Sequence, residues 1–299
     1  MKIDRRFLLL SSLTFLLSSK ESFAEGKILS DEHWACLVDT TLCIGCRKCE
    51  EACNKANKLM KPEFSFEDKE AFKKHRRPEK NAFTVVNEFK GFPSVSQRDK
   101  NTTTVKIQCM HCLDPSCVSA CIVGALYKLE DGPVAYNPNI CIGCRYCMIA
   151  CPFEILAYEY SNPLTPKVRK CQFCINTNKE GKANPACAAA CPTEAIVFGK
   201  RGELLELARN RIKQKKDQYL NHIYGEFEVG GTSWLYLSGR DITELGFKKL
   251  QRQAPPRLTE KIQHSIFKFG AIPIIFYGFL GAIMAYTNRR KKREEENGK

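Results

Sequence analysis

Residues 141–152 read Cys-Ile-Gly-Cys-Arg-Tyr-Cys-Met-Ile-Ala-Cys-Pro, and residues 43–53 read Cys-Ile-Gly-Cys-Arg-Lys-Cys-Glu-Glu-Ala-Cys. Both stretches space their cysteines as C-x2-C-x2-C-x3-C, and two further groups widen the middle gap to four and twelve residues. Sixteen of the 17 cysteines belong to these four groups. The groups are, in chain order, Cys43, Cys46, Cys49 and Cys53; Cys109, Cys112, Cys117 and Cys121; Cys141, Cys144, Cys147 and Cys151; and Cys171, Cys174, Cys187 and Cys191.

This spacing is the one that holds 4Fe–4S clusters in bacterial ferredoxins, where the fourth cysteine of a group ligates the other cluster of a pair. Three closely spaced thiolates on one loop can hold three irons of a cluster. The fourth sits on the following helix and points away, so that it reaches a neighbouring cluster. The sequence therefore predicts four 4Fe–4S clusters.

Three other uses of cysteine fit less well. Disulfides form in exported proteins, but the C-x2-C-x2-C runs crowd the thiols too closely for eight independent bridges. Structural zinc takes pairs of C-x2-C, and the fourth group alone could form such a site. Covalently attached haem needs C-x2-C-H, and none of the six C-x2-C steps is followed by histidine.

Residues 1–24 have the pattern of an export signal. Arg5 and Arg6 precede the apolar stretch Phe7–Leu17, and a small-x-small cleavage site ends at Ala24. The arginine pair resembles a twin-arginine (Tat) signal, which carries folded proteins across a membrane. An ordinary secretory signal, an uncleaved anchor and a buried helix are the alternatives.

The C-terminal end has the pattern of a membrane anchor. Residues 269–286 contain no charged side chain, and a basic run begins at Arg289. We therefore expect a linker at 251–268, a transmembrane anchor at 269–287 and a basic cytoplasmic tail at 288–299. A buried core helix is the alternative. The body of the protein would then lie on the periplasmic side of the inner membrane.

The four groups together resemble the four-cluster ferredoxin-type iron–sulfur subunits of respiratory oxidoreductases, the DMSO reductase and formate dehydrogenase-N beta family. The chain is most similar to the membrane-anchored type found with hydrogenase-2. This likeness is carried by the signal, the C-terminal anchor and the strings Thr41–Cys46, Gln108–Cys112, Gly143–Met148, His222–Glu226, Gly230–Thr232 and Ile262–His264. The chain departs from the family at Ile122, where a proline often follows the fourth cysteine.

The resemblance implies that the first cysteine group pairs with the fourth, and the second with the third. The implied ligands are Cys43, Cys46, Cys49 and Cys191 for cluster 1; Cys109, Cys112, Cys117 and Cys151 for cluster 2; Cys141, Cys144, Cys147 and Cys121 for cluster 3; and Cys171, Cys174, Cys187 and Cys53 for cluster 4.

The expected fold is α+β. It has two pseudo-symmetric, bacterial-ferredoxin-like double-cluster units within residues 25–250 and one C-terminal transmembrane helix. Strands are expected at Trp34–Val38, Gly132–Tyr136, Ala195–Phe198 and Trp234–Leu237, a surface helix at Glu203–Gln218, and helix starts after each third cysteine. An insertion at about 58–105 combines a charged segment, 61–77, with a β-like segment, Ala82–Phe89. It is expected to be a solvated surface loop or a docking element for a catalytic partner.

The expected function is electron relay without catalysis, because the sequence has no glycine-rich phosphate loop and no evident nucleophile with a base. The resemblance implies a periplasmic nickel–iron uptake hydrogenase as donor and an integral membrane quinone-reactive subunit as acceptor. A formate dehydrogenase or another molybdopterin oxidoreductase is the alternative donor. Catalysis by the chain itself and a purely structural metal scaffold are alternatives of other classes.

Three further residues have two interpretations each. Cys36 lies outside the four groups and is expected to be a buried free thiol. His111 lies between two cysteines of the second group, where it could ligate iron or could tune a cluster potential by hydrogen bonding. His264 precedes the apolar stretch, where it could lie near a quinone or belong to a solvated linker.

The formal net charge of +14 would ordinarily indicate a partner such as nucleic acid. Metal-bound thiols are deprotonated, so each oxidised cluster with four thiolates carries a charge of about −2. Four clusters, together with the basic signal and tail, leave the body of the protein close to neutral. Nucleic-acid binding is therefore not expected.

Overall fold

The computed structural model describes residues 30–91, 102–161, 167–175, 184–256 and 271–297. The chain divides into two compact units, Met1–Ala254 and Pro255–Lys299. The expected signal at 1–24, His264 and most of the expected linker lie outside the described residues. These expectations therefore stay predictions.

A four-stranded sheet forms the centre of the first unit, with the order β8-β1-β10-β9. Strand β1 (Trp34–Asp39) runs parallel to β10 (Trp234–Leu237) and antiparallel to β8 (Ile196–Lys200), and β9 (Ile223–Tyr224) completes the sheet. The apolar residues of β10, and those of β1 after Trp34, are fully buried, as central strands with both faces covered must be. Helix α7 (Arg201–Gln214) follows β8 directly and packs against β1 and β8.

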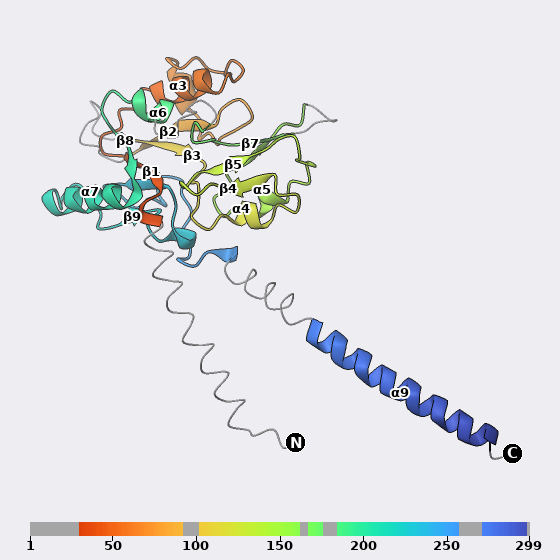
Figure 1. The fold of residues 1–299 in the computed structure, drawn as a ribbon. Coiled ribbons are helices and arrows are strands. Elements are labelled where there is room, and N and C mark those ends of the chain that lie inside the picture. Colours follow the sequence, from red (N-terminus) through yellow and green to blue (C-terminus); the bar gives the residue numbers. More distant parts are fainter. Residues whose placement is uncertain (1–29, 92–101, 162–166, 176–183, 257–270, 298–299) are drawn as a thin grey trace. The chain divides into compact units, whose positions relative to one another are not determined.

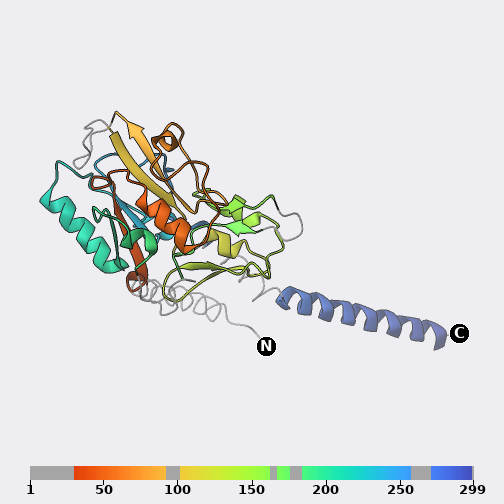
Figure 2. The same ribbon diagram turned by 90° about the horizontal axis from the view of Figure 1, so that it is seen from above.

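Three two-stranded antiparallel ladders surround this sheet (Figure 1). They are formed by β2 (Thr84–Lys90) with β3 (Thr102–Gln108), β4 (Leu126–Lys128) with β5 (Val134–Tyr136), and β6 (Ala157–Tyr158) with β7 (Val168–Arg169). Figures 1 and 2 both place α7 on one side of this unit and the β4–β5 ladder on the opposite side. Two single-turn 3-10 helices, η1 (Lys69–Phe72) and η2 (Glu228–Gly230), lie in the connections.

Four short helices carry cysteines of the four groups. They are α3 (Lys48–Ala56), α4 (Ser116–Ser119), α5 (Tyr146–Ala150) and α6 (Ala186–Ala189). Helix α3 packs against α6, and α4 packs against α5. The first cysteine group is thereby brought to the fourth, and the second to the third.

The expected helix starts were wrong in position, because each helix begins one residue before the third cysteine of its group. The third thiol therefore lies in the first helical turn, where the preceding loop turns into the helix. The strand expected at Trp234–Leu237 is confirmed with the same bounds, and those expected at Trp34–Val38 and Ala82–Phe89 are confirmed with boundaries shifted by one or two residues. The helix expected at Glu203–Gln218 begins earlier, at Arg201, and ends at Gln214.

The segment expected to anchor the chain at 269–287 overlaps helix α9 (Ala271–Asn297). This helix continues without a break through the basic run that was expected to follow it as a tail. Among the described residues, no helix is both long enough and apolar enough to cross a membrane. The first residues of the transmembrane anchor expected at 269–287 lie outside the described residues, and that expectation stays a prediction.

Candidate metal centres

The loops of the first and third cysteine groups have the same backbone conformation. Gly45 and Gly143 have φ values of 69° and 70°, and the arginines that follow, Arg47 and Arg145, have φ values of 59° and 61°. A Cβ atom at Gly45 would lie 2.9 Å from a methyl carbon of Thr104, so the close approach also favours glycine. The repeated turns support the pseudo-symmetry expected from the sequence.

The four ligands implied for cluster 1 come together in the structure. Cys43, Cys46, Cys49 and Cys191 line one cavity between α3 and the start of β8. Burial raises the pKa of Cys43, and the nearby thiols of Cys191 and Cys46 raise it further. A donor set of four thiols around one cavity fits the chemistry of a 4Fe–4S cluster.

The cysteines that act most strongly on Cys53 belong to a different sequence group. Burial raises the pKa of Cys53 well above the usual value, and the closest cysteine influences are Cys171, Cys187 and Cys174. All three belong to the fourth group, as implied for cluster 4. The crossing over of the first and fourth groups is thus visible in the positions of the thiols.

The second and third groups are interleaved in the same way. Burial raises the pKa of Cys112, and Cys117, Cys109 and Cys151 raise it further. Burial raises the pKa of Cys147 to about 11, with Cys121 as its first cysteine neighbour. Each group therefore places its fourth cysteine beside the other group, as implied for clusters 2 and 3.

A site for a single metal ion needs its ligands closer together than the cysteines of these four sites lie. Within the described parts of the chain, no three His, Cys, Asp or Glu side chains come close enough to hold a single metal ion. The assignment of the sixteen cysteines to four clusters stays a prediction, with the neighbour relations above as its structural support.

The sites implied for clusters 1 and 3 are the most accessible to solvent. Cys46 and Cys144 are the exposed cysteines of the chain, whereas most thiols of clusters 2 and 4 are buried or nearly so. Apolar side chains flank the cysteines of cluster 3 and are exposed to solvent. They are Ile122, Ile140, Ile142, Tyr146 and Ile149, which we call the cluster 3 patch. Ile149 is 82 % exposed, which is unusual for an isoleucine without a partner.

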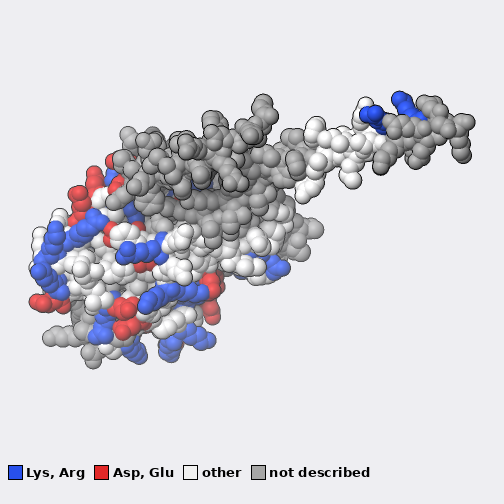
Figure 3. Space-filling model, turned by 90° about the horizontal axis from the view of Figure 1, so that it is seen from below, with Lys and Arg blue, Asp and Glu red and all other residues white. Residues whose placement is uncertain are grey.

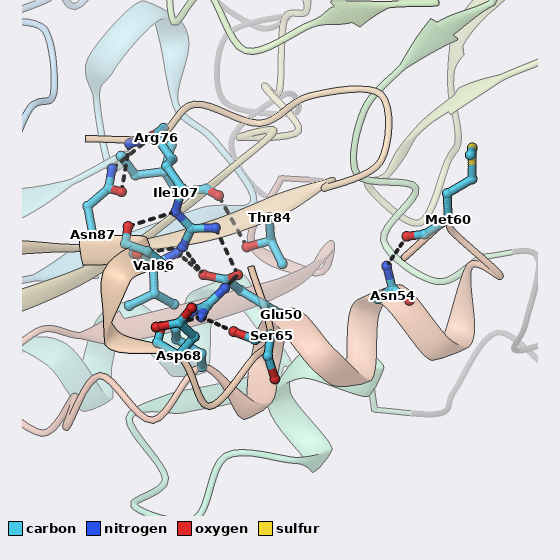
Figure 4. A network of polar contacts seen from close by, with 12 residues as sticks. Glu50, Asn54, Met60, Ser65, Asp68, Arg76, Thr84, Val86, Asn87 and Ile107 are labelled. Carbon is cyan, nitrogen blue, oxygen red and sulfur yellow. Dashed lines mark hydrogen bonds and ion pairs between the residues drawn. The ribbon is translucent and has the colours of Figure 1, made fainter. Parts of the chain in front are cut away.

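A buried carboxylate fastens the insertion to the helix that carries Cys49 and Cys53 (Figure 4). Glu50 on α3 accepts from Arg47 at 3.0 Å, from Arg76 at 2.6 Å and from the amide of Val86 at 2.6 Å. Arg76 also donates to the carbonyl of Val86. The charged segment 61–77 was expected to be a solvated loop. It is so only in part, because Arg76 is half-buried and paired with Glu50.

Two buried lysines, Lys106 and Lys170, and the partly buried Lys128 lie among the cysteines. The ammonium group of Lys106 is near Cys187, Cys49, Cys171 and Cys53. Lys170 donates to the carbonyls of Val134 and Cys171, and Lys128 donates to the carbonyls of Cys112 and Gly132. The sequence analysis missed these residues. Strand alternation gives no signal for the burial of Lys106, because it shares a face of β3 with the polar Gln108.

His111 and Cys36 are both fully buried. The Nδ1 atom of His111 accepts a hydrogen bond from the amide of Val134 at 2.9 Å, which occupies one of the two nitrogens that could ligate iron. Burial lowers its pKa well below the usual value, and Lys170 and Lys128 lower it further. Cys36 is the buried free thiol that was expected, and it lies beside Cys187.

The surface carries both signs of charge. On the face shown in Figure 3, Lys and Arg side chains are interspersed with Asp and Glu. Mixed charge of this kind differs from the continuous basic stripe by which proteins bind the phosphates of nucleic acids.

Comparison with known protein families and proteins identifies relatives of the whole chain. Residues 101–201 match the family model described as 4Fe-4S dicluster domain. A protein of Nitratidesulfovibrio vulgaris is 39 % identical over 299 residues, covering 96 % of this chain and 78 % of that protein.

Two relatives have informative names. The hydrogenase-2 operon protein HybA of Escherichia coli O157:H7 is 32 % identical over 289 residues, covering 88 % of this chain and 86 % of HybA. The nitrate-inducible formate dehydrogenase iron–sulfur subunit of Escherichia coli K12 is 34 % identical over 273 residues, covering 87 % of each chain.

Proposed function

Because the chain belongs to the family of ferredoxin-type iron–sulfur electron-transfer subunits that includes HybA and the formate dehydrogenase iron–sulfur subunits, we propose that it relays electrons through four 4Fe–4S clusters. The observation that carries this proposal is the crossing over of the cysteine groups, above all Cys53 beside Cys171, Cys174 and Cys187. When bound, each cluster would accept and release one electron at a time.

The neighbour relations among thiols give the order of the relay. Cys49 of cluster 1 is a neighbour of Cys187 of cluster 4. Cys171 of cluster 4 is a neighbour of Cys109 of cluster 2, and Cys117 of cluster 2 is a neighbour of Cys147 of cluster 3. The order 1–4–2–3 follows, with clusters 1 and 3 at the ends.

The accessible ends are where partners would exchange electrons with the chain. Cys46 opens the cluster 1 end to solvent, and Cys144 opens the cluster 3 end. The cluster 3 patch supplies apolar area for a partner that covers it permanently. We propose that the catalytic subunit binds at cluster 1 and that an integral membrane quinone-reactive subunit binds at cluster 3.

The favoured catalytic partner is a nickel–iron hydrogenase, because HybA is the hydrogenase-2 relative and matches most of this chain. A formate dehydrogenase is the second candidate, supported by the similar match to the formate dehydrogenase subunits. The Arg5-Arg6 signal supports delivery of the folded protein to the periplasmic side of the inner membrane.

The test uses the native complex, solubilised from membranes and purified through this chain. Hydrogen gas should reduce the clusters, as seen by their electron paramagnetic resonance (EPR) signals, and formate should not. Reduction by formate alone would replace the hydrogenase with a formate dehydrogenase. A complex without four clusters in this chain would overturn the proposed relay itself.

A further inference from the structure

Lys106 occupies an unusual place for a lysine. Its side chain projects from β3 into the core of the first unit and is 2 % exposed. The ammonium group donates to the side-chain oxygen of Gln108 at 2.7 Å and lies 4.2 Å from the centre of the Trp234 ring. Gln108 is held in turn by the hydroxyl of Tyr236 at 2.7 Å. The position of the ammonium group is therefore fixed by Gln108, which Tyr236 holds, and by the ring of Trp234.

In the part of the chain that the structure describes, no carboxylate forms an ion pair with this ammonium group. Among the described residues, the groups that raise the pKa of Lys106 are the thiols of Cys187, Cys49, Cys171 and Cys53, which act against the lowering caused by burial. A buried ammonium group without a paired negative charge is strongly unfavourable. The compensating negative charge must come from the cysteines and from what they bind.

The cysteines around Lys106 belong to two different sites. Lys106 lines the same cavity as all four cysteines implied for cluster 1. Three further thiols that act electrostatically on Lys106, namely Cys53, Cys171 and Cys187, are implied for cluster 4. One ammonium group therefore faces both sites of the first pair.

We propose that Lys106 is a shared positioning charge for clusters 1 and 4, which raises the reduction potentials of both. This inference rests on the proposed four-cluster relay. Reduction adds one electron and makes each cluster with its thiolates more negative by one charge. A fixed positive charge stabilises the reduced form more than the oxidised form, so the potential rises. Electrons that enter at cluster 1 would then pass through two clusters whose reduction potentials are both raised by Lys106.

Lys128 makes the contrast that gives the proposal its specificity. Its ammonium group donates to the carbonyl of Cys112 at 2.7 Å, and Cys112 is implied for cluster 2. Lys170 is not such a contrast, because it donates to the carbonyl of Cys171, which is implied for cluster 4. Lys128 is therefore the lysine placed at a site other than clusters 1 and 4.

The experiment is an EPR-monitored redox titration of the full-length, cluster-loaded chain. In Lys106→Met, two of the four potentials should become more negative. The reduced-to-oxidised ratio at a fixed potential should fall at least tenfold, a shift of about 59 mV for a one-electron couple. Lys106→Arg, which keeps the charge, should stay close to the parent. Lys128→Met, the matched control, removes a charge held at Cys112 and should shift cluster 2 instead.

The outcomes separate this inference from the proposed relay. A fully loaded Lys106→Met protein with four unchanged potentials overturns the role of Lys106 and leaves the relay intact. A parent protein that lacks cluster 1 or cluster 4 overturns both.

A second measurement covers the case in which the Lys106→Met protein does not acquire its clusters. Pulsed EPR on the parent chain containing 15N-lysine should detect a nitrogen coupled to a reduced cluster, and Lys106→Arg should lose that coupling. A spectrum that is identical in the two proteins contradicts the proposal.

Discussion

Cys49 and Cys53 lie one helical turn apart on α3, yet their thiols are neighbours of different cysteine groups. Cys49 lines the cavity that also contains Cys43, Cys46 and Cys191. Cys53 has Cys171 as its first cysteine neighbour. A single helix therefore contributes to two sites, which is the arrangement that brings two clusters close enough for electron transfer.

Substitution of these two cysteines should affect two different clusters. Cys53→Ser should weaken or remove cluster 4, and Cys49→Ser should do the same to cluster 1, each with a loss of up to about four iron atoms. EPR spectra of the reduced proteins distinguish the two. The matched control is Cys36→Ser, a buried cysteine outside the four groups, which should retain every cluster. The same signal lost in both Cys49→Ser and Cys53→Ser would contradict the crossing over.

The buried carboxylate of Glu50 should matter far more to stability than its exposed neighbour Glu51. Glu50→Gln leaves Arg47 and Arg76 buried without their shared negative charge, which typically costs about 3–5 kcal/mol. Glu51 pairs with Lys55 on the surface of the same helix, and Glu51→Gln should cost less than about 1 kcal/mol. Circular dichroism of the cluster-loaded proteins, unfolded by denaturant without oxygen, compares the two midpoints. Equal midpoints would show that the network in Figure 4 adds no stability.

The cluster 3 patch should be needed for electron exit and not for electron entry. Ile149→Glu places a charge in the patch and should weaken association with the membrane partner about tenfold, as a loss of roughly 1.4 kcal/mol at an interface does. Quinone reduction by the complex should slow, while reduction of the clusters by hydrogen stays unchanged. Leu220→Glu, at an exposed leucine outside the patch, is the control. A slower reduction of the clusters themselves would argue against this orientation.

The arginine pair of the signal should decide where the loaded protein is found. Because clusters are assembled in the cytoplasm, a folded chain needs the twin-arginine route. Arg5→Lys combined with Arg6→Lys should leave cluster-loaded protein in the cytoplasm, as measured by fractionation and iron content. Normal periplasmic delivery of that variant would refute this route.

Local patterns predicted more of this protein than long-range ones did. The cysteine spacing indicated the four groups, and the apolar runs at Trp34–Val38 and Trp234–Leu237 indicated strands that the structure contains. Both signals depend on neighbouring residues only. The pairing of the groups came from family resemblance, because the spacing of one group does not specify which other group it meets.

Lys106 shows why the remainder could not be predicted. A lysine in an alternating strand is ordinarily a surface residue. Its burial is tolerated because thiols from α3 and α6 surround it, and Cys187 lies far from Lys106 along the chain. The burial of charge in the insertion also depends on a partner distant in the sequence, because Arg76 donates to Glu50 on α3. The anchor expected at 269–287 stays a prediction, because the segment at which it would begin lies outside the described residues.

The most direct test of the four-cluster relay is the iron and acid-labile sulfide content of the purified full-length chain, measured without exposure to oxygen. Four 4Fe–4S clusters require about 16 iron and about 16 sulfide per chain, with Mössbauer spectra of cubane clusters. Zinc in place of iron, or about eight iron per chain, would contradict the account.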